Sequence, residues 1–197
     1  IIGLAVLLII LSTVSYVQRK RAKDQLKLLK TPDYLTGLLN RGTGLAFLKE
    51  QIDEADKNNT KLSIVFIDVN ELKTVNDTYG HPAGDSVLKQ LADLIKNSIR
   101  DSDTVFRFGG EEFIILMPQT SLEGGYAFAD RLRKLIMDKT FSIGPITVQI
   151  TSSFGITSMG DTNSQNLEGY YHLADRALYL AKQRGKNRVE IVCGKAD

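Results

Sequence analysis

Apolar runs along the chain predict five short strands. Residues 62–69 are almost continuously apolar, which is typical of a strand buried on both faces. Residues 104–108 and 113–117 are rich in β-branched and aromatic side chains, and the two glycines between them permit the positive φ that a tight hairpin needs. Two more strands are predicted at residues 148–156 and 189–192.

Apolar side chains at helical spacing predict four amphipathic helices, one before the first strand and three between later strands. They are marked by residues 45–55, 87–95, 128–136 and 173–181. Residues 68–85 read as a loop-rich stretch dense in polar groups. The core order is therefore β-α-β-β-α-β, an α+β, ferredoxin-like fold with a central antiparallel sheet flanked by helices. In this topology the first strand lies beside the hairpin, so we expect Asp68 to approach Glu111.

The first 32 residues differ from the rest in polarity. Residues 1–17 contain no charged side chain and would span roughly 26 Å as a helix, slightly less than a bilayer core of about 30 Å. We interpret them as a truncated transmembrane helix, followed by a helical linker at residues 18–32. A buried or coiled-coil helix is an alternative because the run is short. A cleaved signal peptide fits less well, since the basic residues follow the apolar run.

Charge is unevenly distributed along the chain. Residues 18–30 hold six of the 25 basic and one of the 23 acidic residues, which leaves 19 basic and 22 acidic residues elsewhere, a net charge of −3. The basic cluster places the remainder in the cytoplasm at the inner membrane by the positive-inside rule. A slightly acidic globule argues against a nucleic-acid partner. The single Cys193 excludes an internal disulfide and a cysteine-rich metal site.

Four separated motifs carry most of the chemistry-bearing side chains. They are residues 35–38 (LTGL), 68–85, 109–113 (GGEEF) and 174–179 (ADRALY). In this order they resemble the GGDEF family of diguanylate cyclases across residues 33–192, which leaves residues 193–197 as a tail. The resemblance implies a fold similar to the polymerase palm and a homodimer that condenses two GTP into cyclic di-GMP and two pyrophosphates. The alternative is a non-catalytic receptor for cyclic di-GMP or GTP, although such receptors generally lose an acid of the hairpin.

The resemblance also implies a metal site. Asp68, the backbone carbonyl of Val69 and Glu111 match the family's ligand positions, and hard cations prefer such oxygen ligands. Mg²⁺ is the expected cofactor, with Mn²⁺ as an alternative. Glu111 or Glu112 is expected to accept the proton of the attacking ribose 3′-hydroxyl. Because adjacent strand residues point to opposite faces, we expect only one of the two to do so.

A set of GTP-binding residues follows from the same match: Lys73, Asn76, His81, Asp85, Lys182 and Lys186. The Asp85 carboxylate is suited to accept from the N1–H and the exocyclic amine of guanine. Outside this context, His81 would be a structural turn residue. Lys186 stands where the family usually has Arg, so a bidentate phosphate contact is lost. Asn70 stands where the family often has Asp, which removes one negative charge near the metal ligands.

Arg100 and Asp103 match the family's RxxD product-inhibition site. Arg100 can present its guanidinium to guanine or phosphate acceptors, and Asp103 can accept from a guanine edge. The alternative is a solvated ion pair on the surface. Tyr170, Tyr171 and His172 match no role of the family and are interpreted as packing or surface residues.

Overall fold

The computed structural model describes residue 13 and residues 31–159 and 167–192. All of the predicted membrane helix except residue 13, almost all of the linker and the whole C-terminal tail lie outside these ranges. Within the described ranges, no helix is long and apolar enough to cross a membrane. Residues 32–197 form one compact unit, and the predicted core lies in it.

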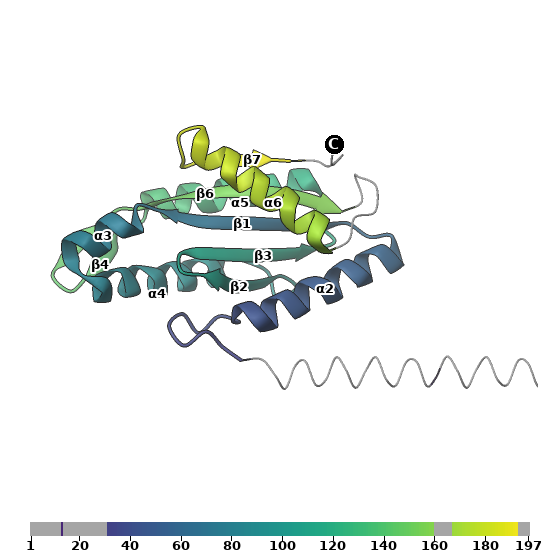
Figure 1. The fold of residues 1–197 in the computed structure, drawn as a ribbon, viewed down its shortest axis with the longest axis horizontal. Helices are drawn as coiled ribbons and strands as arrows, with labels where there is room; N and C mark the ends of the chain where they lie inside the picture. The colour runs from purple at the N-terminus through teal and green to yellow at the C-terminus, as the bar shows by residue number, and fades with distance from the viewer. Residues whose placement is uncertain (1–12, 14–30, 160–166, 193–197) are drawn as a thin grey trace, which may run out of the picture. The chain divides into compact units, whose positions relative to one another are not determined.

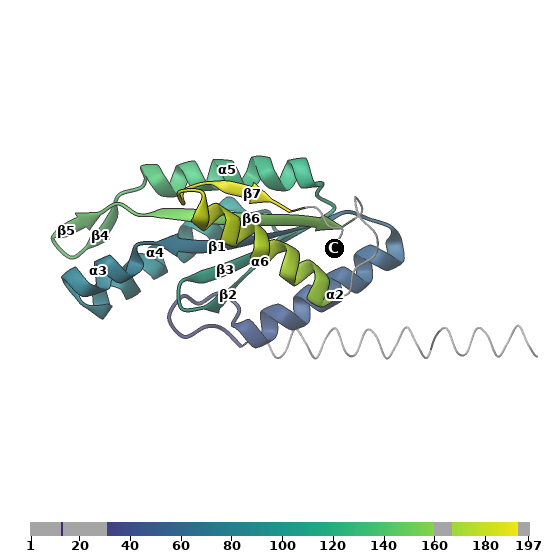
Figure 2. The ribbon, with the colours of Figure 1, turned by 45° about the horizontal axis from the view of Figure 1, so that its top comes forward.

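A five-stranded sheet forms the centre of this unit (Figures 1 and 2). Its strands are β1 (Leu62–Asn70), β2 (Thr104–Gly109), β3 (Glu112–Pro118), β6 (Thr151–Met159) and β7 (Val189–Ile191). The spatial order is β2-β3-β1-β6-β7, with all pairs antiparallel except β6 and β7. This confirms the predicted α+β, ferredoxin-like arrangement. It also confirms that the first strand lies beside the hairpin, in the middle of the sheet.

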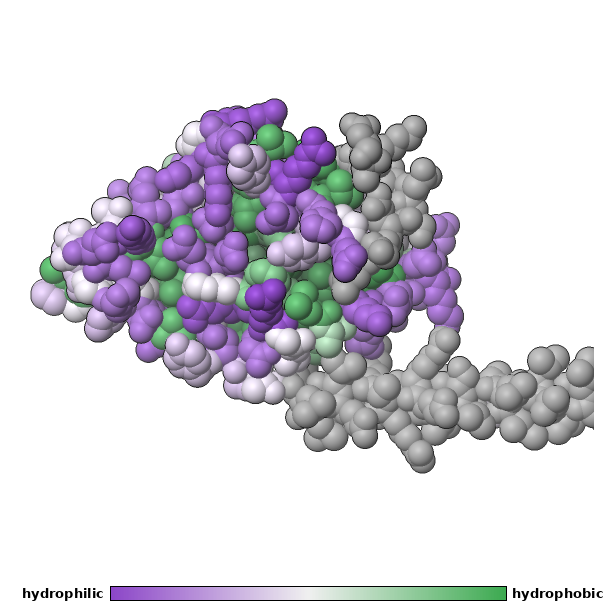
Figure 3. Space-filling view, viewed as in Figure 1, coloured by the Kyte–Doolittle hydropathy of each residue, from purple (hydrophilic) through white to green (hydrophobic). Residues whose placement is uncertain are grey.

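Helices cover both faces of the sheet. They are α2 (Arg41–Asn58), α3 (Leu72–Tyr79), α4 (His81–Ser98), α5 (Leu122–Asp138) and α6 (Leu167–Gln183). Alternate residues of β1 pack against α2 and α6 on one face and against α4 and α5 on the other, so every residue of β1 is buried. The face seen in Figure 3 is mainly hydrophilic, as expected when the apolar stripes of the helices turn inward.

Close packing of α6 on the sheet depends on Gly155 in β6. A Cβ atom at this position would collide with the backbone of Leu178 and with the carbonyl oxygen of Ala174. The helix therefore lies directly against the strand, and Ala174 and Leu178 are buried there. This contact fixes the height of α6 above the end of β1, where Asp68 lies.

Two predictions about the extent of helices and strands were wrong. Residues 68–85 are mostly helical, because α3 and α4 follow β1 almost at once and are separated by Gly80, whose φ is 83°. Only two residues of α3 are buried, so its apolar pattern is too sparse to identify from periodicity. The strand predicted at residues 148–156 is divided between β5 (Ile146–Val148), which pairs with β4 (Phe141–Ile143), and β6.

The hairpin of β4 and β5 is attached to α4 by two side chains, those of Gln90 and Ser86. Gln90 Nε2 donates to the carbonyl oxygen of Ser142 at 2.8 Å, and the Ser142 N–H donates to Gln90 Oε1 at 3.1 Å. Ser86 Oγ also donates to the Ser142 carbonyl oxygen, at 3.2 Å. These bonds satisfy the backbone of an edge strand and join it to the helix that carries Asp85.

Candidate functional site

The turn between β2 and β3 presents two acids beside the end of β1. Glu111 lies in the turn and Glu112 begins β3, where it pairs in register with Asp68. The Val69 N–H donates to the Glu111 carbonyl oxygen at 3.1 Å, which ties the turn to β1. The expected approach of Asp68 to Glu111 is therefore confirmed.

The two glycines of this turn act differently from the prediction. Neither Gly109 nor Gly110 has a positive φ, and the pairing register instead shifts between Arg107 and Gly109, as in a β-bulge. A Cβ on Gly110 would meet no atom within 4 Å, whereas one on Gly109 would lie 3.4 Å from Glu112 Oε2. The glycines therefore leave open space around the carboxylates.

The Arg107 side chain binds the backbone of the turn and links it to Asp33. Its Nε and Nη2 donate to the Gly110 carbonyl oxygen at 3.1 Å and 2.6 Å, and its Nη1 lies 3.1 Å from Asp33 Oδ1. Partial burial tends to raise the pKa of Asp33, but hydrogen bonds from Thr36 and the contact with Arg107 outweigh it and lower the pKa. No role was predicted for Arg107 from the sequence. Its position two residues before Gly109 was the available signal, but its partner is 74 residues away.

Asp68 is the most enclosed acid of the site. Its side chain is 7% exposed, and its Oδ2 lies 2.6 Å from the Nζ of Lys182 on α6. Burial raises the pKa of Asp68, while the hydrogen bond and charge of Lys182, and the charge of Lys186, oppose the rise. A buried carboxylate here is therefore balanced by cations from the C-terminal part of the chain.

Both hairpin acids have raised pKa values for the same two leading reasons. Burial is the larger cause and the negative charge of Asp68 the next, with Lys182 acting in the opposite direction. Glu111 and Glu112 line the same pocket. Because Glu111 is a turn residue, the strand alternation that we expected to separate the two acids does not apply to it.

The oxygen donors at this point fit a hard divalent cation. Two acids, Asp68 and Glu111, approach closely enough to disfavour each other's charge, and a cation would relieve that repulsion. The N–H and C=O of a strand residue face the same neighbour, so the Val69 carbonyl is turned toward the hairpin as well. In the described part of the chain, no three His, Cys, Asp or Glu side chains converge as a complete metal cage. The other ligands of a bound cation would be groups other than Asp68, Glu111 and the Val69 carbonyl.

A pocket of about 560 Å³ contains this cluster and extends to α3 and α4. Asn76, Asp85 and Lys182 line it together with the three acids. The Oδ1 atom of Asn76 is buried without a hydrogen-bond partner among the described residues. Gly84 permits this position, because a Cβ there would overlap the Asn76 side chain. The pocket thus combines acids, a lysine and the side chain of Asn76.

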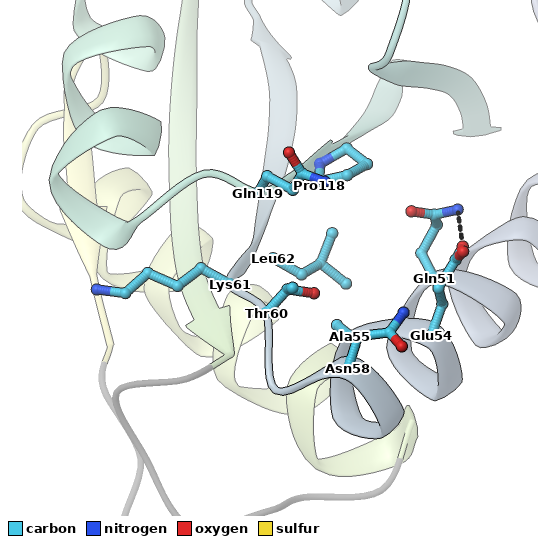
Figure 4. Close-up of a pocket in the computed structure, with 9 residues that line it drawn as sticks. All are labelled: Gln51, Glu54, Ala55, Asn58, Thr60, Lys61, Leu62, Pro118 and Gln119. Atoms are coloured by element: carbon cyan, nitrogen blue, oxygen red, sulfur yellow. Dashed lines mark hydrogen bonds between the residues drawn. The ribbon is translucent and has the colours of Figure 1, made fainter.

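Three other predicted binding residues lie outside the lining of this pocket. Lys73 and His81 are exposed. Lys186 is exposed too, but its charge acts on Asp68 and Glu111. A smaller pocket of about 150 Å³, between α2, the start of β1 and the end of β3, contains no predicted site residue (Figure 4).

Arg100 and Asp103 lie in the turn between α4 and β2. The Arg100 N–H donates to Asp103 Oδ2 at 3.1 Å, and the Asp103 N–H donates to the Arg100 carbonyl oxygen at 3.0 Å. Among the described residues, the Arg100 guanidinium has no carboxylate within ion-pair distance, so the solvated ion pair considered above is not present there. Asp103 is buried and Arg100 is exposed.

An aromatic cluster that was not predicted from the sequence supports the hairpin near Glu112. The Arg41 Cζ lies 4.3 Å from the centroid of the Phe108 ring, and the Phe108 and Tyr171 centroids are 5.5 Å apart. Tyr171 therefore packs as interpreted, and Tyr170 is buried beside it in the chain. Phe108 directly precedes the glycines, so this packing helps to fix the approach of β2 to the turn.

The family model described as diguanylate cyclase, GGDEF domain, matches residues 30–188. The chain belongs to the GGDEF family. Among curated relatives, it is 36% identical over 171 residues to diguanylate cyclase A of Treponema denticola, covering 85% of this chain and 46% of that protein. It is 38% identical over 159 residues to diguanylate cyclase DgcP of Pseudomonas aeruginosa, covering 81% and 23%. The chain thus spans less than half the length of these relatives.

Solved GGDEF domains share the fold. The GGDEF domain of DgcB from Caulobacter crescentus, in complex with c-di-GMP, superposes with a TM-score of 0.77 at 26% identity, covering 83% of this chain and 95% of that one. The active GGEEF domain of a diguanylate cyclase from Vibrio cholerae has a TM-score of 0.73 at 31% identity, covering 79% and 98%. The GGEEF form of the hairpin motif named for the second protein is also the form in this chain.

Proposed function

We propose that this GGDEF domain is the catalytic part of a diguanylate cyclase, which condenses two GTP into cyclic di-GMP and two pyrophosphates. The observation that carries the proposal is the convergence of Asp68, Glu111 and Glu112 in one pocket with Asn76 and Asp85. The intact pair of hairpin acids and the relatives named as diguanylate cyclases support it.

In this proposal, Asp68, the Val69 carbonyl and Glu111 would hold Mg²⁺, with Mn²⁺ as an alternative. The ion, when bound, would stabilise charge on the α-phosphate and lower the pKa of the attacking hydroxyl. The pKa values of Glu111 and Glu112 are raised, so both carboxylates bind a proton more readily than an ordinary glutamate does. Either one is therefore suited to accept the proton of the attacking hydroxyl.

The remaining pocket residues would select and orient the nucleotide. Asp85 would accept from the N1–H and the amine of guanine, and the Asn76 side chain lines the same pocket. Lys182 and Lys186 supply positive charge for phosphate oxygens. Lys73 and His81 would contribute from the exposed side of α3 and the start of α4.

Two copies of the domain would be required for turnover. A pocket of about 560 Å³ has the size of a site for one small ligand. Because the product joins two nucleotides, a symmetric homodimer with facing pockets is the simplest arrangement. Dilution of residues 31–197 should lower the specific activity, whereas a rate strictly proportional to enzyme concentration down to nanomolar levels would contradict the dimer.

Product inhibition and membrane attachment are further parts of the proposal. The exposed Arg100 guanidinium would bind the product's phosphate or guanine acceptors, with Asp103 accepting from a guanine edge. Attachment to the inner membrane through residues 1–17, with the domain in the cytoplasm, is supported by the sequence pattern alone.

Incubation of the purified chain with GTP and Mg²⁺ tests the proposal. Cyclic di-GMP should accumulate with the parent, and not with Glu111→Gln, which keeps the shape of the side chain but cannot accept a proton as a carboxylate does. A parent that binds GTP or cyclic di-GMP but forms no product at any protein concentration would favour the receptor.

A further inference from the structure

Two residues with separate proposed partners are bound to each other in this structure. Asp68, which would hold the divalent cation, and Lys182, which would contact the nucleotide's phosphates, form an ion pair with 2.6 Å between Oδ2 and Nζ. The carboxylate is 7% exposed at the end of β1, and the lysine side chain is 37% exposed in the last turn of α6. The ammonium therefore occupies an oxygen that the cation would use.

The backbones on both sides of this ion pair are fixed. Asp68 lies in a strand paired on both edges, with Glu112 and with Ser153. Close packing of α6 at Gly155 holds the helix that carries Lys182. The flexible four-carbon stem of Lys182, half-exposed, is consequently the part that can move without disturbing the fold.

We propose that Lys182 is a positioning residue that holds Asp68 until a divalent cation and a nucleotide bind together. The inference rests on the proposed function. In the free domain the ammonium balances the buried carboxylate. When Asp68 turns to the cation, Lys182 is released to the phosphate oxygens.

Each ligand alone meets an unfavourable step. A cation without nucleotide must displace the ammonium and leave it close to a second positive charge. A nucleotide that draws Lys182 away without a cation leaves Asp68 buried and unpaired, near the charge of Glu111. When both ligands bind, every charge has a partner. Cation and nucleotide should therefore each increase the affinity for the other by the same factor.

Lys186 offers a matched control. Its charge also acts on Asp68 and Glu111, but it is exposed and has no ion-pair partner among the described residues. Lys182→Met and Lys186→Met each remove one positive charge near the same carboxylates. Only the first removes a direct contact with Asp68. Comparison of the two variants therefore separates competition between the Lys182 ammonium and the cation from the effect of removing a nearby positive charge.

The test measures Mn²⁺ binding to the whole chain without nucleotide, by the electron paramagnetic resonance signal of free Mn²⁺. Lys182→Met should bind Mn²⁺ about five- to tenfold more tightly than the parent, and Lys186→Met should stay within about twofold. Lys182→Arg keeps a cation next to Asp68 and should remain close to the parent. Asp68→Asn should weaken binding in each background. Equal tightening in the two methionine variants, or unchanged affinity in Lys182→Met, would overturn the inference.

A second titration measures the coupling. A non-hydrolysable GTP analogue should tighten Mn²⁺ binding in the parent, and by a clearly smaller factor in Lys182→Met; an identical factor in both would also overturn the inference. Neither titration requires turnover. A chain that forms no cyclic di-GMP yet shows these shifts would refute the proposed function and leave the role of Lys182 standing. A chain that forms cyclic di-GMP but lacks these shifts in Mn²⁺ affinity would support the proposed function and refute the role of Lys182.

Discussion

Replacement of Arg107 by Met should lower both the stability of the fold and the turnover of the molecules that remain folded. The change keeps an unbranched apolar stem but removes the guanidinium of a side chain that is 12% exposed. This guanidinium bonds twice to the Gly110 carbonyl oxygen and pairs with Asp33. A hydrogen bond to a charged group contributes about 1.5–3 kcal/mol, and both bonds share one acceptor, so they count as one. The partly exposed ion pair adds at most about 1 kcal/mol. We expect the free energy of unfolding to fall by about 2–3 kcal/mol, which lowers Tm by roughly 5–10 °C.

Turnover by the folded protein should fall as well, because Gly110 directly precedes Glu111. Without Arg107 the turn can shift, and a displacement of about 1 Å at a reacting group can cost about 100-fold in rate. Asp33→Asn is the control, since it removes the charge of the ion pair and leaves both bonds to Gly110 in place. That variant should lose up to about 1 kcal/mol of stability and keep most of its activity.

The assay combines thermal unfolding with the initial rate of cyclic di-GMP formation, measured at least about 15 °C below the Tm of each variant so that the chains are folded. The reasoning is refuted if folded Arg107→Met turns over within about twofold of the parent, because the guanidinium would then stabilise the fold without positioning Glu111.

Three further predictions address the acids, the base and the product site. Without divalent cation, Glu111→Gln should raise Tm at pH 7 by about 1–3 °C, because a raised folded-state pKa means that the ionised acid costs stability at high pH. The difference should shrink as pH falls through the folded pKa toward 4.5, and a constant difference down to that pH would contradict it. Asp85 should confer GTP preference in an equal mixture with ATP, since adenine has an acceptor at N1; predominant cyclic GMP-AMP would show that Asp85 does not read the base. Arg100→Ala should keep the initial rate and continue to accumulate cyclic di-GMP where the parent stalls, whereas identical plateaus would limit Arg100 and Asp103 to a structural turn.

The strands of the sheet could be predicted well because short stretches of the sequence carry the pattern of apolar residues that marks each one. The continuous apolar run ending at Asp68 and the two strands around the glycines determine which segments pair, and the fold then brings Asp68 to the hairpin acids. The turn itself was predicted incorrectly. A bulge between Arg107 and Gly109, and not a positive φ at the glycines, shapes it, and no single-residue preference distinguishes these solutions.

The side-chain contacts that position the acids of the site could not be predicted from apolar patterns in the sequence. The contact of Arg107 with Asp33 joins residues 74 apart, and a role for Lys182 beyond phosphate binding appears only once α6 is placed over β1. The helix α3 was missed because it buries only Leu72 and Val75, while the Asn76 side chain lines the pocket. A short helix that serves a binding site has too few apolar positions for its period to be recognised.

We propose that one cluster of acids at the end of β1 and in the hairpin catalyses the condensation of two GTP. Pyrophosphate and cyclic di-GMP released from GTP by the whole chain, with Mg²⁺ present, should be measured in the same reaction. We expect two pyrophosphates per cyclic di-GMP with the parent and neither product with Asp68→Asn. Undiminished release of both products by Asp68→Asn, or pyrophosphate release by the parent without cyclic di-GMP, would contradict it.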